Sequence, residues 1–283
     1  MRIRSRPNFR SERKANSNHK SMNLMKTNIL LGSLVVLAAS LAADSVSKDE
    51  VTGAAKALAA KSYSWKTTIQ AAGGGGGGGN RGGGPGATEG KVEPDGYTWV
   101  SMARGQNTIE GVVKGTKGAV KLEDGWKSFE EATAGGGAGA GAGGGQGGGG
   151  RNPGRMAARM LQNFKAPAVQ AQEIAGRVKE FTKTDDTISG EFTEDGAKQM
   201  LTFGGRRGGG GGGGGNAPEV SGAKGTVKFW IKDGVLTKYQ FNVQGKVSFN
   251  GNDRDVDRTT TVEFKDVGTT KVSVPEEAAK KAS

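Results

Sequence analysis

Apolar residues recur along this chain with two different periods, which predict helices and strands in alternation. The capping-box sequence 47–50 precedes a helical repeat of apolar residues over 51–59, a pattern that is typical of an amphipathic helix. Residues 63–69 are aromatic and β-branched, which favours a strand. Further strands are expected, between glycine-containing turns, around 97–102, 108–114 and 119–122. The first half therefore predicts a helix followed by an antiparallel meander.

The second half predicts helices first and then long strands. Helical spacing is carried by Met156, Met160, Leu161 and Phe164, and after Pro167 by Ala171, Ile174, Val178 and Phe181. Thr193 is expected to cap a third helix that contains Ala197, Met200 and Leu201. Alternating apolar residues then predict strands at 227–231, 235–249, 256–264 and 271–274, with Asn250 and Gly251 in a hairpin turn.

Together these elements predict an α+β fold on one antiparallel sheet. A strand as long as 235–249 has to twist and curl strongly. A curled sheet needs apolar groups on its concave side, and the middle helices can supply them. We therefore expect a strongly curved antiparallel sheet, an incomplete β-barrel, with helices packed over its concave face.

Three glycine-rich tracts, at 73–86, 135–150 and 204–215, hold 33 of the 52 glycines. Polyglycine has maximal backbone entropy and no side chain to bury, so these tracts are expected to be disordered loops. Because a longer loop adds little closure entropy, we expect the tracts to interrupt a single domain at 43–283 and not to separate three domains.

The apolar run at 29–43 follows Lys26 and has about the length of a signal-peptide core. It is short for a bilayer span, which needs roughly 20 apolar residues. We expect a signal peptide at 1–42, cleaved after Ala42 or one residue later; an uncleaved anchor is the alternative. The residues before this run are long for such a leader, so Met22 or Met25 is the suspected start. The protein is then expected in the periplasm or secreted, with no membrane span after processing.

Removal of 1–42 changes the charge balance, because this segment holds eight Lys/Arg and a single acid. The net charge falls from +12 to +5, which does not call for a nucleic-acid partner. The chain has no cysteine, and its one histidine, His19, lies in the presequence. These absences exclude lipobox acylation, disulfides, ordinary zinc sites and Ser-His-Asp or Cys-His catalysis. We expect no cofactor, no metal and no enzymatic activity.

Three polar patterns suggest other chemistry. Adjacent acids at 130–131, 185–186 and 276–277 would point apart on strands, unlike a glycosidase pair. The alternating acids of 252–257 suggest a calcium loop, but they lack its turn glycine and final Glu and are neutralised by Arg254 and Arg258. A charged hairpin that keeps a strand soluble is the simpler interpretation. The arginines beside the glycine tracts lack the aromatic residues of RNA-binding repeats; they are inert spacers or weak contacts for anionic lipid or envelope polymer.

The order of elements resembles the periplasmic lipoprotein carriers and lipid-binding lipoproteins of the LolA, LolB and LppX/LprG type. The likeness is carried by the leading helix with Tyr63-Ser64-Trp65, by 117–126, and above all by 225–243 and 261–278. In those last stretches a strand ends in an Asp-Gly turn, and the chain closes with F-x-D-x-G and V-x-x-P. The resemblance implies an incomplete barrel closed by helices over an apolar cavity. Without a lipobox, the chain is more similar to the soluble LolA-type members.

Large apolar side chains would line such a cavity. The candidates are Trp65, Tyr97, Trp99, Met102, Met156, Met160, Phe164, Phe229, Tyr239 and Phe241. Methionines pack adaptably against variable ligands. We therefore expect an exported, monomeric carrier for a lipid acyl chain, a lipidated protein or another apolar ligand. The alternative is a structural or adhesive envelope protein whose Gly/Arg loops contact anionic surface polymers; a carboxylate hydrolase is a third hypothesis.

Overall fold

The structure, a computed structural model, describes residues 44–46, 48–71, 87–94, 96–104, 107–134, 153–202, 218–249 and 252–283. All of them belong to one compact unit, 41–283. The expected signal peptide at 1–42, the three glycine tracts and the turn residues Asn250 and Gly251 lie outside the described residues.

The described residues form twelve strands and six helices. The strands are β1 (Asp44–Val46), β2 (Tyr63–Ala71), β3 (Thr88–Val92), β4 (Thr98–Arg104), β5 (Asn107–Lys114), β6 (Lys117–Leu122), β7 (Gly125–Ser128), β8 (Val178–Thr184), β9 (Thr187–Phe192), β10 (Glu219–Lys232), β11 (Val235–Phe249) and β12 (Asn252–Lys265). The helices are α1 (Lys48–Ala59), α2 (Phe129–Ala134), α3 (Pro153–Gln162), α4 (Pro167–Ala175), α5 (Glu194–Thr202) and α6 (Glu276–Lys281).

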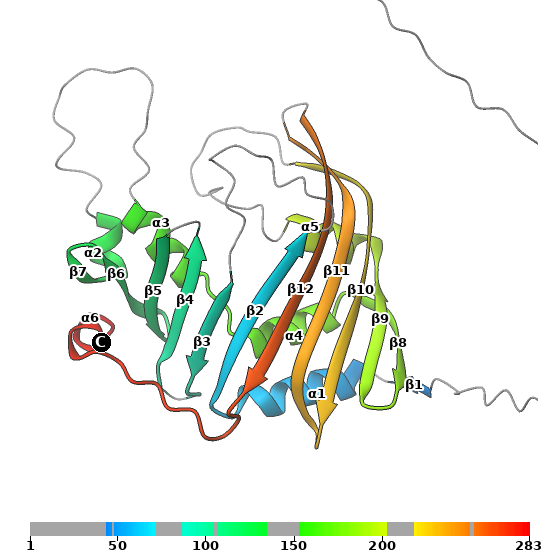
Figure 1. The fold of residues 1–283 in the computed structure, drawn as a ribbon, viewed down its shortest axis with the longest axis horizontal. Coiled ribbons are helices and arrows are strands. Elements are labelled where there is room, and N and C mark those ends of the chain that lie inside the picture. Colours follow the sequence, from blue (N-terminus) through cyan, green and yellow to red (C-terminus); the bar gives the residue numbers. More distant parts are fainter. Residues whose placement is uncertain are drawn as a thin grey trace, which may run out of the picture. The chain divides into compact units, whose positions relative to one another are not determined.

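All twelve strands belong to one sheet, in the order β1-β8-β9-β10-β11-β12-β2-β3-β4-β5-β6-β7 (Figure 1). Two antiparallel meanders, β2 to β7 and β8 to β12, are joined where β12 pairs with β2. The sheet is strongly curved and is not closed into a barrel, because β1 and β7 remain at its two edges. The expected α+β fold with a curved, open antiparallel sheet is therefore confirmed.

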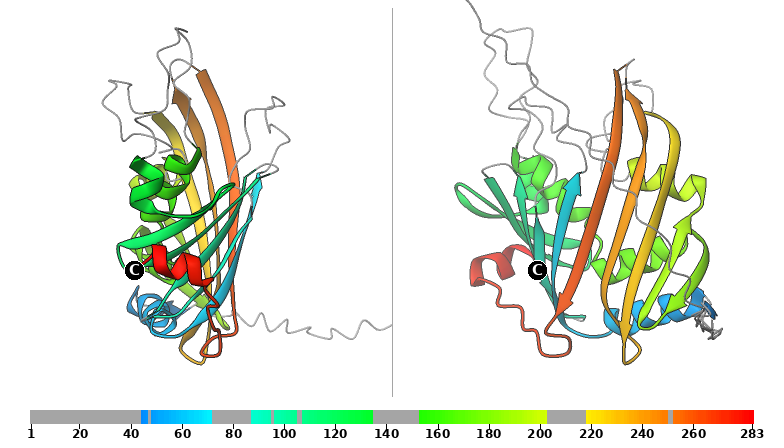
Figure 2. Two further views of the ribbon diagram at one scale, coloured as in Figure 1. Left: turned by 90° about the vertical axis from the view of Figure 1, so that its left-hand side faces the viewer. Right: turned by 45° about the vertical axis from the view of Figure 1, so that its right-hand side comes forward.

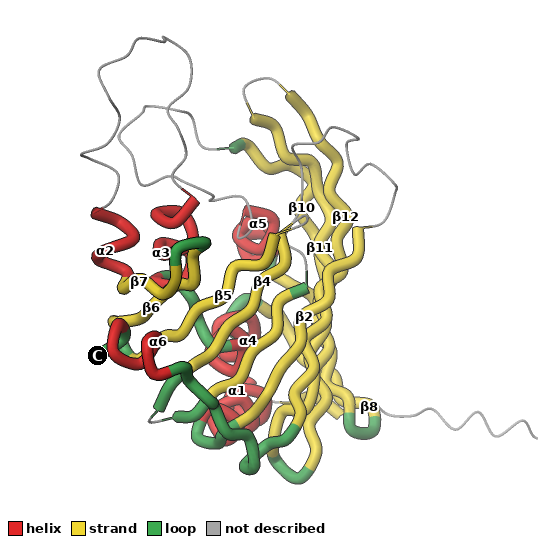
Figure 3. Tube along the Cα trace, turned by 60° about the vertical axis from the view of Figure 1, so that its left-hand side comes forward, coloured by secondary structure: helices red, strands yellow, loops and turns green. Residues whose placement is uncertain are grey.

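Helices α1, α4 and α5 pack on the concave face of the sheet, with α2 and α3 over its β5 to β7 end (Figures 2 and 3). Helix α6 lies on the opposite face of that end. The alternation of β6 shows this, because Gly118 faces the Phe129 ring of α2 whereas Ala119 packs with Ala278 of α6. The β6 region is thus covered on both faces.

Glycines of the sheet leave room for large side chains, from helix α3 in one case and from a neighbouring strand in another. A Cβ at Gly111 would lie 2.2 Å from the Leu161 side chain of α3, and one at Gly90 would lie 2.1 Å from the Trp65 ring. Real Cβ atoms do not reach such distances, so only glycine fits where these side chains rest on the backbone. The large side chains of Leu161 and Trp65 occupy the space that side chains at these glycines would take, on the concave side of the sheet.

The helix expected from Ala171 to Phe181 is wrong in its second half. Helix α4 ends at Ala175, and Val178 and Phe181 lie on β8. The reason is a register irregularity between Val178 and Phe181. A bulge places two residues opposite one, so two apolar residues three apart share one face of a strand and imitate helical spacing.

The strand expected at 271–274 is also wrong, because these residues belong to no strand. The Val272 amide donates to a carboxylate oxygen of Glu93 at 3.0 Å, not to a neighbouring strand. The adjacent acids are not on strands either: 130–131 and 276–277 lie in the first turns of α2 and α6, and 185–186 lie between β8 and β9. The cap at Thr193 is confirmed by its hydroxyl, which accepts from the Gly196 amide at 3.0 Å.

Candidate ligand-binding face

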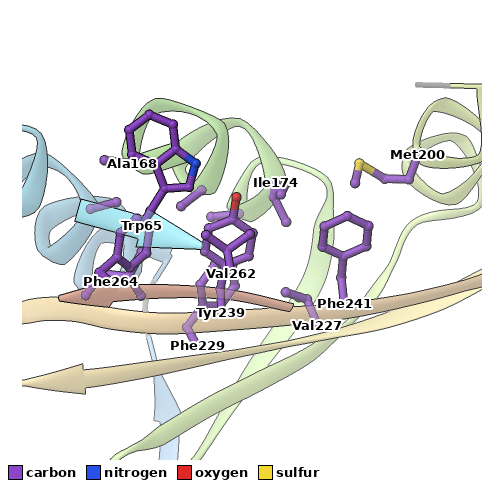
Figure 4. Packing of buried hydrophobic residues seen from close by; sticks show 14 of the residues in the cluster. Trp65, Ala168, Ile174, Met200, Val227, Phe229, Tyr239, Phe241, Val262 and Phe264 are labelled. Carbon is purple, nitrogen blue, oxygen red and sulfur yellow. The ribbon is translucent and has the colours of Figure 1, made fainter. Parts of the chain in front are cut away.

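The concave face of β10, β11, β12 and β2 carries a continuous layer of aromatic side chains, which we call the packed region. Of the sequence candidates, Trp65, Phe229, Tyr239 and Phe241 lie here and are 0–7% exposed. Tyr239 lies between neighbours on three sides, with ring centroids at 6.2 Å to Phe229, 6.5 Å to Phe241 and 6.0 Å to Phe264. Figure 4 shows these rings directed toward the helices. The sheet therefore supplies the bulk of this interior.

The helices facing this layer supply mainly small side chains. Helix α1 buries Ala54 and Ala55 beside Val51 and Leu58, and α4 buries Ala168, Ala171 and Ala175 beside Ile174. Large rings from the sheet pack against these alanines, and of the two pockets described below only the smaller reaches this layer, at Ala54 and Ile188 on its edge. In this conformation the packed region is filled by its own side chains.

Two tyrosine hydroxyls are buried in this apolar layer. The Tyr63 hydroxyl lies near the Ala168 backbone without reaching hydrogen-bond geometry to any described residue, and the Tyr239 hydroxyl reaches the Gln170 side-chain oxygen only at 3.5 Å. Burial raises the pKa of Tyr63 to about 12 and also raises the pKa of Tyr239, because a phenolate loses its hydration there. A buried hydroxyl without a hydrogen-bond partner lowers the stability of the fold. These hydroxyls are therefore polar groups in an otherwise apolar face.

The remaining sequence candidates are divided among three places. Met102 and Phe164 are half-buried against the packed region, where Phe164 stacks on Trp65 at 5.7 Å. Met156 and Met160 are half-buried on α3. Tyr97 and Trp99 belong to a second apolar cluster on the opposite face, beneath α6. The structure therefore does not bring all ten candidates together.

Beyond α5, the concave face of the three longest strands continues as a mixed apolar and basic surface, which we call the distal patch. It consists of Val220 on β10, Val247 on β11, and Arg254, Val256 and Arg258 on β12. Val247 is paired with both Val220 and Arg254, so these side chains share one face. The three valines are half-buried against the core, and Arg254 is exposed.

Arg258 lies where the distal patch meets α5. Its Nη2 donates to the carbonyl oxygen of Met200 at 3.0 Å, whereas its Nε is buried without a hydrogen-bond partner among the described residues. No ion pair within the described part of the chain involves this guanidinium. Burial lowers the pKa of Arg258, since the charged form is poorly solvated there.

The acids interleaved with these arginines lie on the other, convex face. Asp257 accepts from the amides of Asn242 and Gln244 at 2.8 and 3.1 Å, and Asp253 pairs with Lys246 at 3.8 Å. Strand alternation thus separates the charges of 253–258, with the carboxylates on the convex face and the guanidinium groups on the concave face. Across the residues that the structure describes, no group of three or more acids or histidines is placed to hold a metal.

Sequence reasoning missed the distal patch. Arg254 and Arg258 entered it only as charges that neutralise a run of acids. The signal was present in the two-residue period of 253–258, which puts acids at odd positions and Arg, Val and Arg at even positions. This period indicates a basic concave surface only once the structure shows which face of the sheet is concave.

Two surface pockets lie at other places. One of about 260 Å³ is lined by residues such as Glu50, Lys183 and Asp233, and one of about 530 Å³ by Lys61, Glu93 and Lys271 among others. Neither is lined by a sequence candidate, and both have a mixed lining of charged and apolar residues, with Ala54, Ile188 and Ile231 in the smaller one.

No family model, curated protein or solved structure matches this chain. Among the helices that the structure describes, none has the length and apolar character needed to cross a membrane. The functional interpretation therefore depends on the geometry of the concave face.

Proposed function

We propose that this protein is an exported, LolA-like carrier that binds a lipid acyl chain, or a ligand of similar apolar character, on its concave face without covalent chemistry. The observation that supports this function is the distal patch. There the strands β10, β11 and β12 extend beyond α5 (Figure 1) and keep Val220, Val247 and Val256 only half-buried. Each methylene that a ligand buries against them contributes about 0.8 kcal/mol.

Helix α5 separates the distal patch from the packed region. It contacts the sheet through Leu201, which packs so closely on Gly245 that a Cβ at Gly245 would lie 2.6 Å from the Leu201 Cδ1 atom. Displacement of this one nine-residue helix would join the valines to Val243 and Phe241 in a single apolar track along β11. A chain entering at the distal patch would then meet the aromatic layer and its two tyrosine hydroxyls.

A second function, a structural or adhesive envelope protein, is favoured by one observation. The packed region is already filled by its own aromatic and alanine side chains, as a purely structural core would be. The two functions differ in whether the concave face accepts a ligand at all.

The test is binding of a fluorescent fatty acid, cis-parinaric acid, to the full chain, with native mass spectrometry of protein purified from the cell envelope. Val247→Asp places a charge in the distal patch, and Ser248→Asp places the same charge on the adjacent, convex-facing residue. We expect Val247→Asp to weaken binding at least about tenfold, which corresponds to about 1.4 kcal/mol, and Ser248→Asp to leave it unchanged.

Equal binding by both variants would refute the carrier function at this face. A protein that carries no lipid and does not bind the probe would support the structural function instead.

A further inference from the structure

Two arginines face the concave side at the distal patch, and the structure gives them almost no counter-charge. Arg254 and Arg258 flank Val256 on β12, while Asp253, Asp255 and Asp257 point to the convex side. The described residues around them on this face carry no negative charge: they are Val220, Val247, Val256, Ala71 opposite Arg258, and the end of α5. A surface that is apolar and cationic at once is complementary to a molecule that is apolar and anionic at once.

Arg258 is the stronger evidence for a missing anionic partner, because its environment is partly apolar. A guanidinium carries five N–H donors, and the described partners account for one, the Met200 carbonyl. That bond gives Arg258 a structural role at the C-terminal turn of α5, where a cation is favourable. It does not explain the buried Nε, nor a charge held at an apolar surface without a carboxylate, which is costly.

The spacing allows both arginines to contact one anionic group. Four residues along a strand span roughly 13 Å, and each arginine side chain can extend several ångströms toward a point between them. Val256, which lies between the two, and its neighbour Val247 would form the apolar floor beneath that point. Arginine is also the side chain best suited to bidentate contact with phosphate or carboxylate.

We propose that the ligand of the distal patch is one amphiphilic molecule with a phosphate or carboxylate head. The head is held between Arg254 and Arg258, and the acyl chain lies on Val220, Val247 and Val256. This inference rests on the proposed function, since it specifies the ligand of the same face.

The experiment compares ligands that share a chain and differ in the head, using the full-length protein. Oleate is measured against oleyl alcohol, and lysophosphatidylglycerol against lysophosphatidylcholine of the same acyl chain. The variants are Arg254→Gln, Arg258→Gln and Arg258→Lys, with Lys246→Gln as the matched control, because it removes one positive charge from the convex face of the same hairpin.

We expect the wild type to bind each anionic ligand at least about tenfold more tightly than its neutral or zwitterionic partner. Arg254→Gln and Arg258→Gln should reduce this preference several-fold while changing the affinity for oleyl alcohol less than about twofold. Arg258→Lys should keep most of the preference, and Lys246→Gln all of it. Because Arg254 is exposed, its variant tests the proposal even if Arg258→Gln does not fold.

Equal affinity of the wild type for oleate and oleyl alcohol would overturn the inference while leaving the proposed function intact. A loss of preference in Lys246→Gln as large as in the arginine variants would also overturn it, since the effect would then be long-range. Inorganic phosphate or polyphosphate that binds as tightly as the lysolipid would show an anion site without an amphiphile. If no acyl ligand binds the wild type, the proposed function itself fails.

Discussion

Replacing Tyr63 with phenylalanine should make the protein more stable. The ring is fully buried, with an edge contact to Phe264 at 5.4 Å and to Trp65 at 6.1 Å, and phenylalanine retains both contacts. Only the hydroxyl is lost, and among the described residues it has the Ala168 backbone nearby but no hydrogen bond of normal geometry. A buried unsatisfied polar group costs about 1–3 kcal/mol, whereas in the unfolded chain the same hydroxyl is hydrated.

We therefore expect Tyr63→Phe to raise the free energy of unfolding by about 1 kcal/mol. In urea, with a slope of about 2 kcal/mol per molar, the midpoint would rise by about 0.5 M at unchanged slope. Tryptophan fluorescence follows the transition, because Trp65 lies beside the substitution.

The matched control is Tyr239→Phe. Its hydroxyl has a contact at the limit of a hydrogen bond, 3.5 Å to Gln170, so its removal should change stability less than removal of the Tyr63 hydroxyl. A decrease of more than about 0.5 kcal/mol for Tyr63→Phe would refute the reasoning, because that is the sign expected when a satisfied hydroxyl is removed. It would mean that the hydroxyl has a partner in solution.

Two further predictions concern the same fold. Tyrosines in the unfolded chain ionise near pH 10, whereas burial raises the pKa of Tyr63 to about 12. Above pH 10 the free energy of unfolding should therefore fall by roughly 1.4 kcal/mol per pH unit for each buried tyrosine. Tyr63→Phe should reduce that slope, measured by urea titrations at several pH values. Gly118→Ala should destabilise the protein by about 1–3 kcal/mol, since the new Cβ would lie 2.3 Å from the Phe129 ring. Gly53→Ala, in open space on α1, should instead stabilise it by up to about 1 kcal/mol; equal effects at the two glycines in thermal melts would contradict the packing described.

Much of the fold could be predicted from the sequence, because its long elements obey simple periods. The alternation over 235–249 and the cap at Thr193 both appear in the structure as β11 and α5. The failure at Val178 and Phe181 has a local cause, since a bulge changes the period of a strand and pattern reasoning has no means to see it. Short elements such as β3 and α6 carry too few apolar positions to be recognised.

The candidate site was only partly predictable. Side-chain type correctly identifies Trp65 and Tyr239 as interior groups, but it does not say which face of a sheet each residue occupies. Tyr97 and Trp99 are as aromatic as the others and lie beneath α6 because of their strand register. Arg258 faces inward for the same reason, and register depends on pairings between distant segments that a single sequence does not display.

The junction between the two meanders has a consequence for how the chain acquires its structure. Strand β2 is one of the first to be synthesised, yet its partner on one side is β12; the Ser64 hydroxyl donates to the Lys265 carbonyl, 201 residues later. Until that last long strand emerges from the ribosome, the leading meander has an unprotected edge at what becomes the middle of the sheet. Such non-local closure is slow, and an exposed edge invites pairing between chains. The strand edge at β2 is therefore expected to stay open to pairing with other chains until nearly the whole protein has been synthesised.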